Sequence, residues 1–280
     1  MPMIWQHIPT TLLRPVVVAM LITPLLGFTF LESVLAPKAD LWPRWQAFNP
    51  VSREAIDHRL WDRFLKTYVK KNSNGVNRVA YGRLGEGGKV ALADYLDRMA
   101  KTPISLYGRP VQKAFWINLY NALTVRLIID SYPVTSIQDL DSPWYKKVIE
   151  VEGVALTLND IEHRILRPIW RDARVHYAVN CASIGCPNLI PVAFTGGNIS
   201  QLLELVAYSY INHPRGVRIK DGNLIVSKIY AWFSEDFGGT QESVIAHLRE
   251  YAKPGLLDAL RGRNAIDDYE YDWGLNRAGS

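Results

Sequence analysis

The hydrophobic pattern of the chain begins with an apolar run, from residue 15 to residue 31, that no charged residue interrupts. Arg14 stands immediately before this run, and a basic residue followed by an apolar stretch is typical of an export signal. A core helix of a soluble protein normally carries a polar stripe, which the run lacks. We therefore expect residues 1–36 to be a signal peptide or a membrane anchor that directs the chain to export.

The sequence leaves open whether this segment is cleaved. The run is shorter than the roughly 20 residues that span a bilayer comfortably, and Pro24 and Gly27 weaken a helix, which favours a signal peptide. Cleavage after Ala36 would place Pro37 directly behind the cut, which favours an anchor. Both outcomes predict the periplasm, or the outer face of the inner membrane, of a bacterium. An uncleaved segment would also make the membrane a partner.

Helical patterns dominate the first half of the chain that follows. Prolines in residues 37–51 favour extended backbone, so we expect a linker there and a globular domain over residues 52–276. A helix capped by Asn159 or Asp160 should end or kink at Pro168. The other segments that we expect to be helical are residues 52–71, 89–99, 111–132 and 201–212, and the stretch that follows residue 226 up to about residue 260. In most of them apolar residues recur three and four positions apart.

Strand patterns are short and mostly come in pairs. Alternation around Gly153 and around Asp221-Gly222 predicts hairpins over residues 148–158 and 217–226. A β-prone run over residues 175–179 predicts a strand that leads into a loop of small residues. We therefore expect a single mixed domain of the α/β or α+β class, with a helix-rich N-terminal half, short strands and hairpins, preceded by the export segment.

Composition and charge narrow the range of functions. The 280 residues are 48% hydrophobic, which indicates an ordered core and confines disorder to the ends. The net charge of +5 is spread over short mixed clusters, so no basic stripe suggests nucleic acid as a partner. Gly238-Gly239 lies in no phosphate-binding pattern, which makes a nucleotide site implausible, and we expect no cofactor.

The two cysteines of the chain, Cys181 and Cys186, lie in one loop. In an exported protein such a pair often forms a disulfide, because the compartment is oxidising. A reactive thiolate would instead need a neighbouring base, and His176, five residues before Cys181, is the nearest one in sequence. A metal site built from these three residues would lack the fourth ligand of a closed zinc site, so we expect no metal.

Other polar residues are candidates for binding or for acid–base chemistry. Glu162 and His163 are adjacent in a helical first turn, where an ordinary ion pair competes with a catalytic role. Asn118 and Asn121 share a face of the long apolar helix, so they could bind a ligand or anchor a loop. Asp236 could orient a histidine, or could cap a turn before Phe-Gly-Gly.

The sequence segments that contain these residues, together with two further segments in the last quarter of the chain, resemble the family named domain of unknown function 547, in its exported bacterial type. The resemblance implies that Asn118, Asn121, Glu162, His163, His176, Cys181, Cys186 and Asp236 belong to the family's shared pattern, without assigning them roles. The segments that carry it are residues 114–121 (AFWINLYN), 158–163 (LNDIEH), 176–187 (HYAVNCASIGCP), 227–230 (SKIY), 236–237 (DF) and 271–276 (YDWGLN).

Three functions remain open. The leading hypothesis is a cell-envelope hydrolase or transferase that depends on a thiol, with Cys186 as nucleophile, His176 as base and Glu162 or Asp236 as orienting carboxylate. Asn118, Asn121, His163 and Cys181 would then contact an unknown small molecule, peptide or glycan. The alternatives are a non-enzymatic periplasmic binding module with a Cys181–Cys186 disulfide, and a thiol-redox domain that cycles the same pair.

Overall fold

The structure, a computed structural model, describes residues 36–279. The apolar run of residues 15–31 lies outside the described residues. Within residues 36–279 no helix is long and apolar enough to cross a membrane. Helices and several small sheets are mixed along the chain, as the sequence predicts.

The helices differ widely in length. They are α2 (Arg59–Tyr68), α3 (Glu86–Ala100), α4 (Arg109–Ser131), α5 (Arg167–Trp170), α6 (Ile199–Ile211), α7 (Ile229–Trp232), α8 (Gln241–Tyr251) and α9 (Pro254–Leu260). The strands are β1 (Val69–Lys70), β2 (Arg78–Val79), β3 (Ile149–Val151), β4 (Val154–Leu156), β5 (Val217–Lys220), β6 (Asn223–Ser227) and β7 (Asp268–Glu270).

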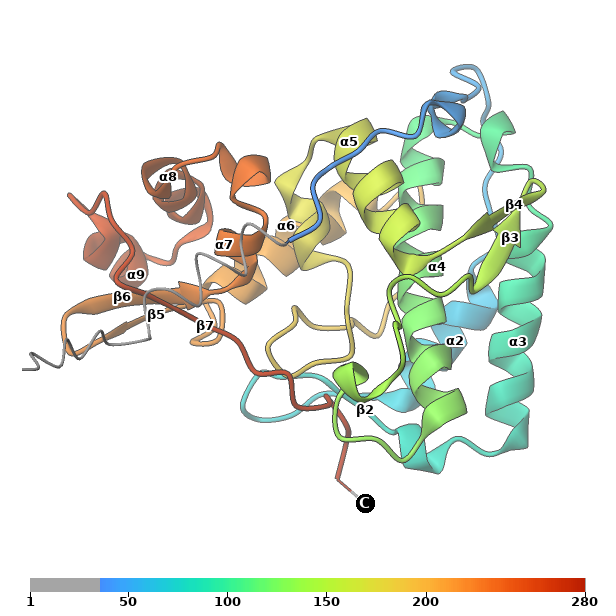
Figure 1. The fold of residues 1–280 in the computed structure, drawn as a ribbon, viewed down its shortest axis with the longest axis horizontal. Helices are drawn as coiled ribbons and strands as arrows, with labels where there is room; N and C mark the ends of the chain where they lie inside the picture. The colour runs from blue at the N-terminus through green and yellow to red at the C-terminus, as the bar shows by residue number, and fades with distance from the viewer. Residues whose placement is uncertain (1–35, 280) are drawn as a thin grey trace, which may run out of the picture.

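Helix α4 is the centre of the larger part of the molecule. Its sequence is apolar on nearly every side, and residues 112–125 are all buried, so the helix must be surrounded by other elements. Helix α3 packs on one side of it and the segment before α5 on another (Figure 1). Pro110 occupies its first turn, where the missing N–H costs nothing, and the helix ends one residue before Tyr132-Pro133.

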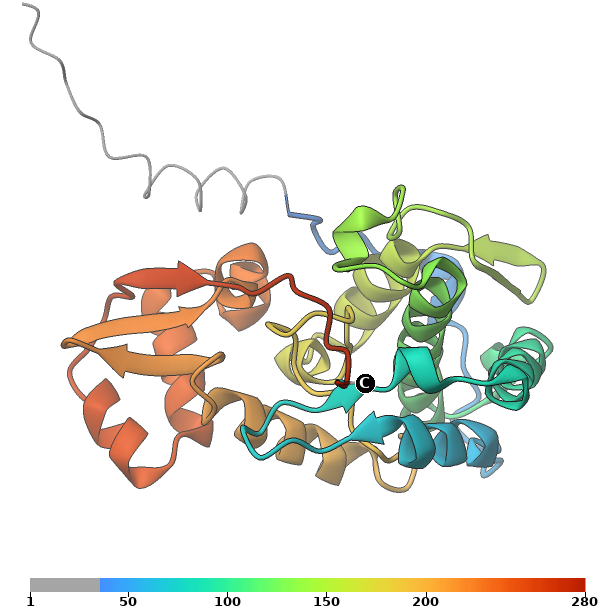
Figure 2. The same ribbon diagram turned by 90° about the horizontal axis from the view of Figure 1, so that it is seen from below.

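A smaller part is built around a three-stranded sheet. Strands β5 and β6 form the predicted hairpin, whose turn residues Asp221 and Gly222 both have positive φ, 51° and 81°. Strand β7 then pairs in parallel with β6, which the sequence pattern did not reveal. Figure 2 shows this sheet, with α9 below it, at the end of the molecule opposite α2 and α3. The second predicted hairpin is also present, as β3 and β4.

Two local predictions are wrong. The first predicted helix begins at Arg59 and not near Ser52, and the Asp57 carboxylate accepts a hydrogen bond from the Arg59 amide at that point (2.9 Å). Residues 175–179 do not form a strand: residues 173–177 form a 3₁₀-helix, whose first turn is capped by Asp172 through the Arg174 amide. The backbone bonds locally instead of to a neighbouring strand, as in the bonds from the Val175 amide to the Asp172 carbonyl and from the Ala178 amide to the Val175 carbonyl (both 3.0 Å).

The helix around Pro168 has an unusual geometry that matters for the site. Residues 160–166 form π-helical turns, in which the Arg167 amide bonds to the Glu162 carbonyl five residues back, and the α-helical turn α5 follows. Wide turns and the missing Pro168 N–H leave carbonyls without helical partners. The carbonyls of His163 and Arg164 accept instead from the amides of Asp40 and Trp42.

The segment predicted as a linker therefore lies against the domain. Its backbone pairs with the π-helical turns, and Figure 1 shows it, in blue, running alongside α5. Trp45, in the 3₁₀-helix of residues 43–46, is 3% exposed and packs edge-on against Trp116 of α4. Burial of large aromatic side chains stabilises this docking.

Candidate active site

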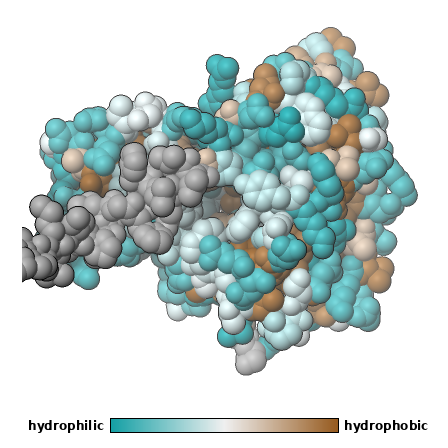
Figure 3. Space-filling view, in the orientation of Figure 1, coloured by the Kyte–Doolittle hydropathy of each residue, from teal (hydrophilic) through white to brown (hydrophobic). Residues whose placement is uncertain are grey.

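A cavity of about 380 Å³ lies where the two parts of the molecule meet. Polar residues line it from the π-helical turns and the 3₁₀-helix of residues 173–177, and the cysteine loop lines another side. Most of its apolar walls are aromatic. The aromatic side chains of these walls are Tyr120, Trp144, Tyr145, Trp232, Phe233, Tyr271 and Trp273. Figure 3 shows a hollow in this face of the molecule, with hydrophobic residues, in brown, inside it.

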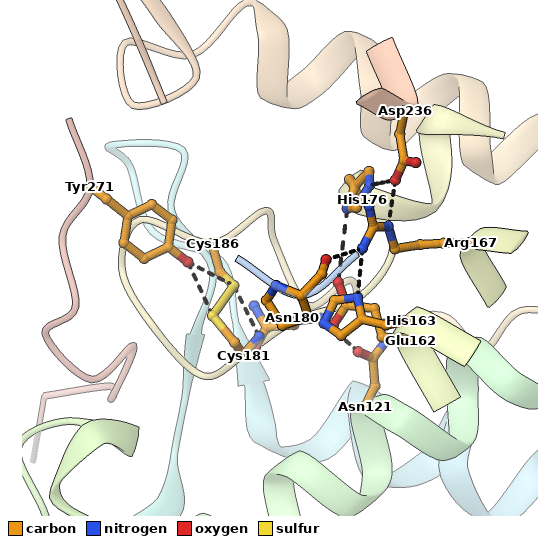
Figure 4. Close-up of polar contacts among 11 residues, drawn as sticks. Asn121, Glu162, His163, Arg167, His176, Asn180, Cys181, Cys186, Asp236 and Tyr271 are labelled. Carbon is orange, nitrogen blue, oxygen red and sulfur yellow. Dashed lines mark hydrogen bonds and ion pairs between the residues drawn. A yellow bond between two sulfur atoms is a disulfide. The ribbon is translucent and has the colours of Figure 1, made fainter. Parts of the chain in front are cut away.

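The predicted catalytic residues Cys186, His176 and Glu162 converge on this cavity, as do Cys181 and His163. The sequence places them up to 24 positions apart in helix, 3₁₀-helix and loop, and only the tertiary fold brings them together (Figure 4). Asp236 reaches the same cluster through His176.

An arginine that the sequence analysis did not single out organises the polar side. Arg167 is 4% exposed; its Nε donates to Asp236 Oδ2 (2.5 Å), and its Nη1 donates to His163 Nδ1 (3.0 Å) and to the Pro37 carbonyl (2.6 Å). Its guanidinium also lies over the Phe233 ring, 4.8 Å from the centroid. Its spacing of four residues from His163, which places both on one helical face, is the signal that could have found it.

Asp236 fixes the ring of His176. Its Oδ2 lies 2.6 Å from His176 Nε2, and the ring stacks almost parallel on Phe233 at a centroid distance of 4.4 Å. Burial alone would raise the pKa of Asp236, but the hydrogen bonds from His176 and Arg167 outweigh it and lower this pKa to about 2. Asp236 is therefore a carboxylate that only accepts, so His176 Nε2 carries a proton and donates it.

The other ring nitrogen of His176 faces Glu162. The two atoms, His176 Nδ1 and Glu162 Oε1, are 3.9 Å apart, which is too far for a direct hydrogen bond. A ring whose single proton is on Nε2 carries a lone pair on Nδ1. A single oxygen atom about 2.8 Å from each of these atoms fits geometrically across the gap, so water or a substrate hydroxyl can bridge them.

His163 is a neutral donor in this arrangement. Burial lowers its pKa to about 4, although the negative charge of Glu162 opposes the shift. Since Arg167 has no acceptor, His163 Nδ1 must accept from it, and the ring proton therefore sits on Nε2. The cavity is thus lined by a neutral N–H donor, His163, as well as by the imidazole of His176.

The cysteines form a disulfide, with their Cα atoms 6.3 Å apart. The Tyr271 hydroxyl lies 3.0 Å from Cys181 Sγ and donates to Cys186 Sγ at 3.2 Å. Burial raises the pKa of Tyr271 well above its usual value, so the phenol keeps its proton. In this state Cys186 is bonded to sulfur and has no thiolate with which to attack a substrate.

Asn118 and Asn121 do not line the cavity. Asn118 exchanges two hydrogen bonds with the backbone of Phe194 (2.7 and 3.1 Å). Asn121 donates to the Ala178 carbonyl (2.9 Å) and accepts from the Asn180 amide (2.8 Å). Both side chains have their oxygen and nitrogen bonded to main chain, so the structure places them as anchors of the loops around the site.

Among residues 36–279 no group of three or more His, Cys, Asp or Glu side chains is arranged to hold a metal ion. The chemistry that these residues can perform by themselves is proton transfer, from a positioned imidazole and carboxylate, and hydrogen bonding to a developing charge.

A known protein family matches the middle of the chain. The model of the family described as "Protein of unknown function, DUF547" matches residues 104–211. This range runs from just before α4 to the end of α6, and it contains Glu162, His163, His176 and both cysteines. No curated protein and no solved structure matches the chain.

Proposed function

Because the chain belongs to the DUF547 family, which is described only by its unknown function, we propose a function from the geometry of the cavity. The proposal is a hydrolase, or a transferase in which a substrate hydroxyl replaces water, with His176 as general base. The observation that carries it is a chain of hydrogen bonds from Arg167 to Asp236 and from Asp236 to His176. At its end His176 Nδ1 faces Glu162 inside the cavity, at a distance of 3.9 Å.

In the proposed reaction a water molecule lies between Glu162 and His176 Nδ1. His176 takes a proton from this water as its oxygen bonds to the electrophilic atom of the substrate. Asp236 stabilises the imidazolium that forms, and the Nε2–H of His163 donates to the oxygen on which negative charge develops. The imidazolium then returns its proton to the leaving group as the bond to that group breaks.

This proposal changes the role of the cysteines from the one that the sequence suggested. A disulfide offers no nucleophile, so Cys186 and Cys181 here form a wall of the cavity and hold the loop that follows His176. Water activated by His176 needs no thiol. We also propose that the reaction takes place in the cell envelope, on the basis of the apolar run of residues 15–31.

The test is hydrolysis by the purified full chain. Chromogenic p-nitrophenyl esters, p-nitroanilides and p-nitrophenyl glycosides cover the main classes of scissile bond. We expect turnover of at least one class, and we expect His176→Gln to reduce it about 100-fold or more, in line with the usual contribution of a general base.

His213→Gln is the matched control, because His213 is a histidine outside the cavity that bonds the Asn74 carbonyl. Its turnover should stay within about twofold of the original rate, as for most changes away from a site. No turnover of any substrate class, or equal turnover by His176→Gln and the original chain, would refute the hydrolase.

A further inference from the structure

Two acceptor side chains in the lining of the cavity bear on the ligand that it would take. Glu162 contributes a carboxylate, and Asn159, which also lines the cavity, has a buried Oδ1 with no hydrogen-bond partner in the part of the chain that the structure describes. An unpaired buried carbonyl oxygen costs free energy until it meets a donor. The cavity therefore favours a ligand group that carries N–H or O–H donors.

The charge around these acceptors is negative. Of the described residues, no Lys or Arg lines the cavity. Arg167, which lies behind it, is already paired with Asp236 at 2.5 Å. The carboxylate of Glu162 is thus the lining group that is left to attract an ion, and an anionic ligand would meet repulsion there.

The aromatic walls reinforce this preference. The Trp273 ring lies 5.9 Å from Trp144 and 4.7 Å from Tyr271, and the ring planes are inclined at 71° and 57°. Rings inclined in this way form a corner instead of the flat platform on which a sugar stacks. Their negatively charged faces attract compact cations. The backbone of Asn159 is held next to this corner, because its main-chain N–H donates to the main-chain carbonyl of Trp144 (2.9 Å).

We propose that the substrate carries a protonated amine, and that this ammonium binds between Glu162, Asn159 Oδ1 and the aromatic corner of Trp144, Tyr271 and Trp273. This inference rests on the proposed hydrolase, because a bound ammonium compound is a substrate only if the protein turns it over. It assigns the substrate class that the hydrolase takes. A primary ammonium suits the site because its positive charge pairs with Glu162 and its N–H groups can donate to Asn159 Oδ1, which has no other donor among the described residues.

The experiment is calorimetric titration of the full chain, in detergent, with three probes of similar size that share a benzene ring. Benzylammonium is the cation, benzyl alcohol its neutral analogue and benzoate the anion. We expect benzylammonium to bind about tenfold more tightly than benzyl alcohol or better, the margin of a charge-assisted hydrogen bond, and benzoate to bind most weakly.

Two variants locate the preference. Glu162→Gln should bring benzylammonium and benzyl alcohol to within about twofold of each other, because it removes the charge but keeps the shape. Asn159→Leu should weaken benzylammonium severalfold. Glu242→Gln, an exposed carboxylate on α8, is the matched control and should leave all three affinities unchanged.

Equal binding of the cation and the alcohol, tighter binding of benzoate, or no saturable binding of any probe would overturn the inference. So would a cation preference that survives Glu162→Gln and Asn159→Leu. These outcomes are separate from those of the hydrolase: His176→Gln reports on turnover alone, and the order of the three probes reports on the ammonium site alone. Preference for benzylammonium in the original chain needs no variant to fold.

Discussion

Asn121 shows how much a single buried amide contributes. It is 2% exposed, and its two hydrogen bonds hold the backbone of Ala178 and Asn180 on either side of the site. Asn121→Ala leaves a buried carbonyl and a buried N–H without this partner. We expect the free energy of unfolding, measured by urea denaturation, to fall by about 2–4 kcal/mol. The exposed Asn223→Ala should change it by less than about 0.5 kcal/mol, and an equal loss in both variants would contradict the anchoring role.

At this same scale the sequence indicated much of the site. Glu162, His163, His176 and both cysteines were predicted and line one cavity. Residue type alone carried that prediction, because imidazole, carboxylate and thiol are the groups that perform proton transfer and nucleophilic attack. Arg167 was missed, since an arginine in a helical stretch is usually a surface residue. Asn159 was expected to cap a helix, but its side chain makes no capping hydrogen bond. Their roles depend on Asp236 and Trp144, which are distant in sequence.

Among the elements, the loop of residues 181–186 combines a covalent and a non-covalent closure. Its disulfide closes a very short loop, whose loss in the reduced chain should lower the free energy of unfolding by about 2 kcal/mol. The fold should persist, because Tyr210 still donates to the Gly185 carbonyl (2.7 Å) and the Ile184 amide to the Gly274 carbonyl (2.8 Å). Denaturation with and without dithiothreitol measures the change. The double variant Cys181→Ser with Cys186→Ser should not respond to the reductant, and a response would mean that the loss comes from elsewhere.

Elements whose signal is local were predictable, and elements whose signal is tertiary were not. Helix α4 and the hairpins β3–β4 and β5–β6 follow from apolar spacing and from turn residues within a few positions. The 3₁₀-helix of residues 173–177 is an exception, because its Asp172 cap is local and was still missed. Strand β7 depends on pairing with β6, in which Asp268 faces Ile225, 43 positions earlier in the chain. Two carbonyls of the π-helical turns accept hydrogen bonds from the amides of residues 40 and 42, more than 120 positions away in the chain.

For the whole molecule, buried histidines predict how stability depends on pH. Burial lowers the pKa of His58, His163 and His247 from 6.5 to about 4. Between pH 6.5 and about 4 the unfolded chain therefore binds more protons at these sites than the folded chain does, so stability rises with pH. We expect the melting temperature to fall steadily as the pH is lowered through this window. His163→Gln should make the fall shallower, and a melting temperature that stays constant from pH 6.5 to 4 would contradict the burial of the three rings.

The contacts of Arg167 also set when the site comes into existence during folding. This guanidinium joins partners 130 positions away, at Pro37, and 69 positions away, at Asp236. Contacts across such long loops form late, because the entropy of loop closure must be offset by structure already made. The ring of His176 is therefore oriented only in a chain that contains both residue 37 and residue 236. If His176 is the base that we propose, the base is in place only after these two segments have docked against Arg167.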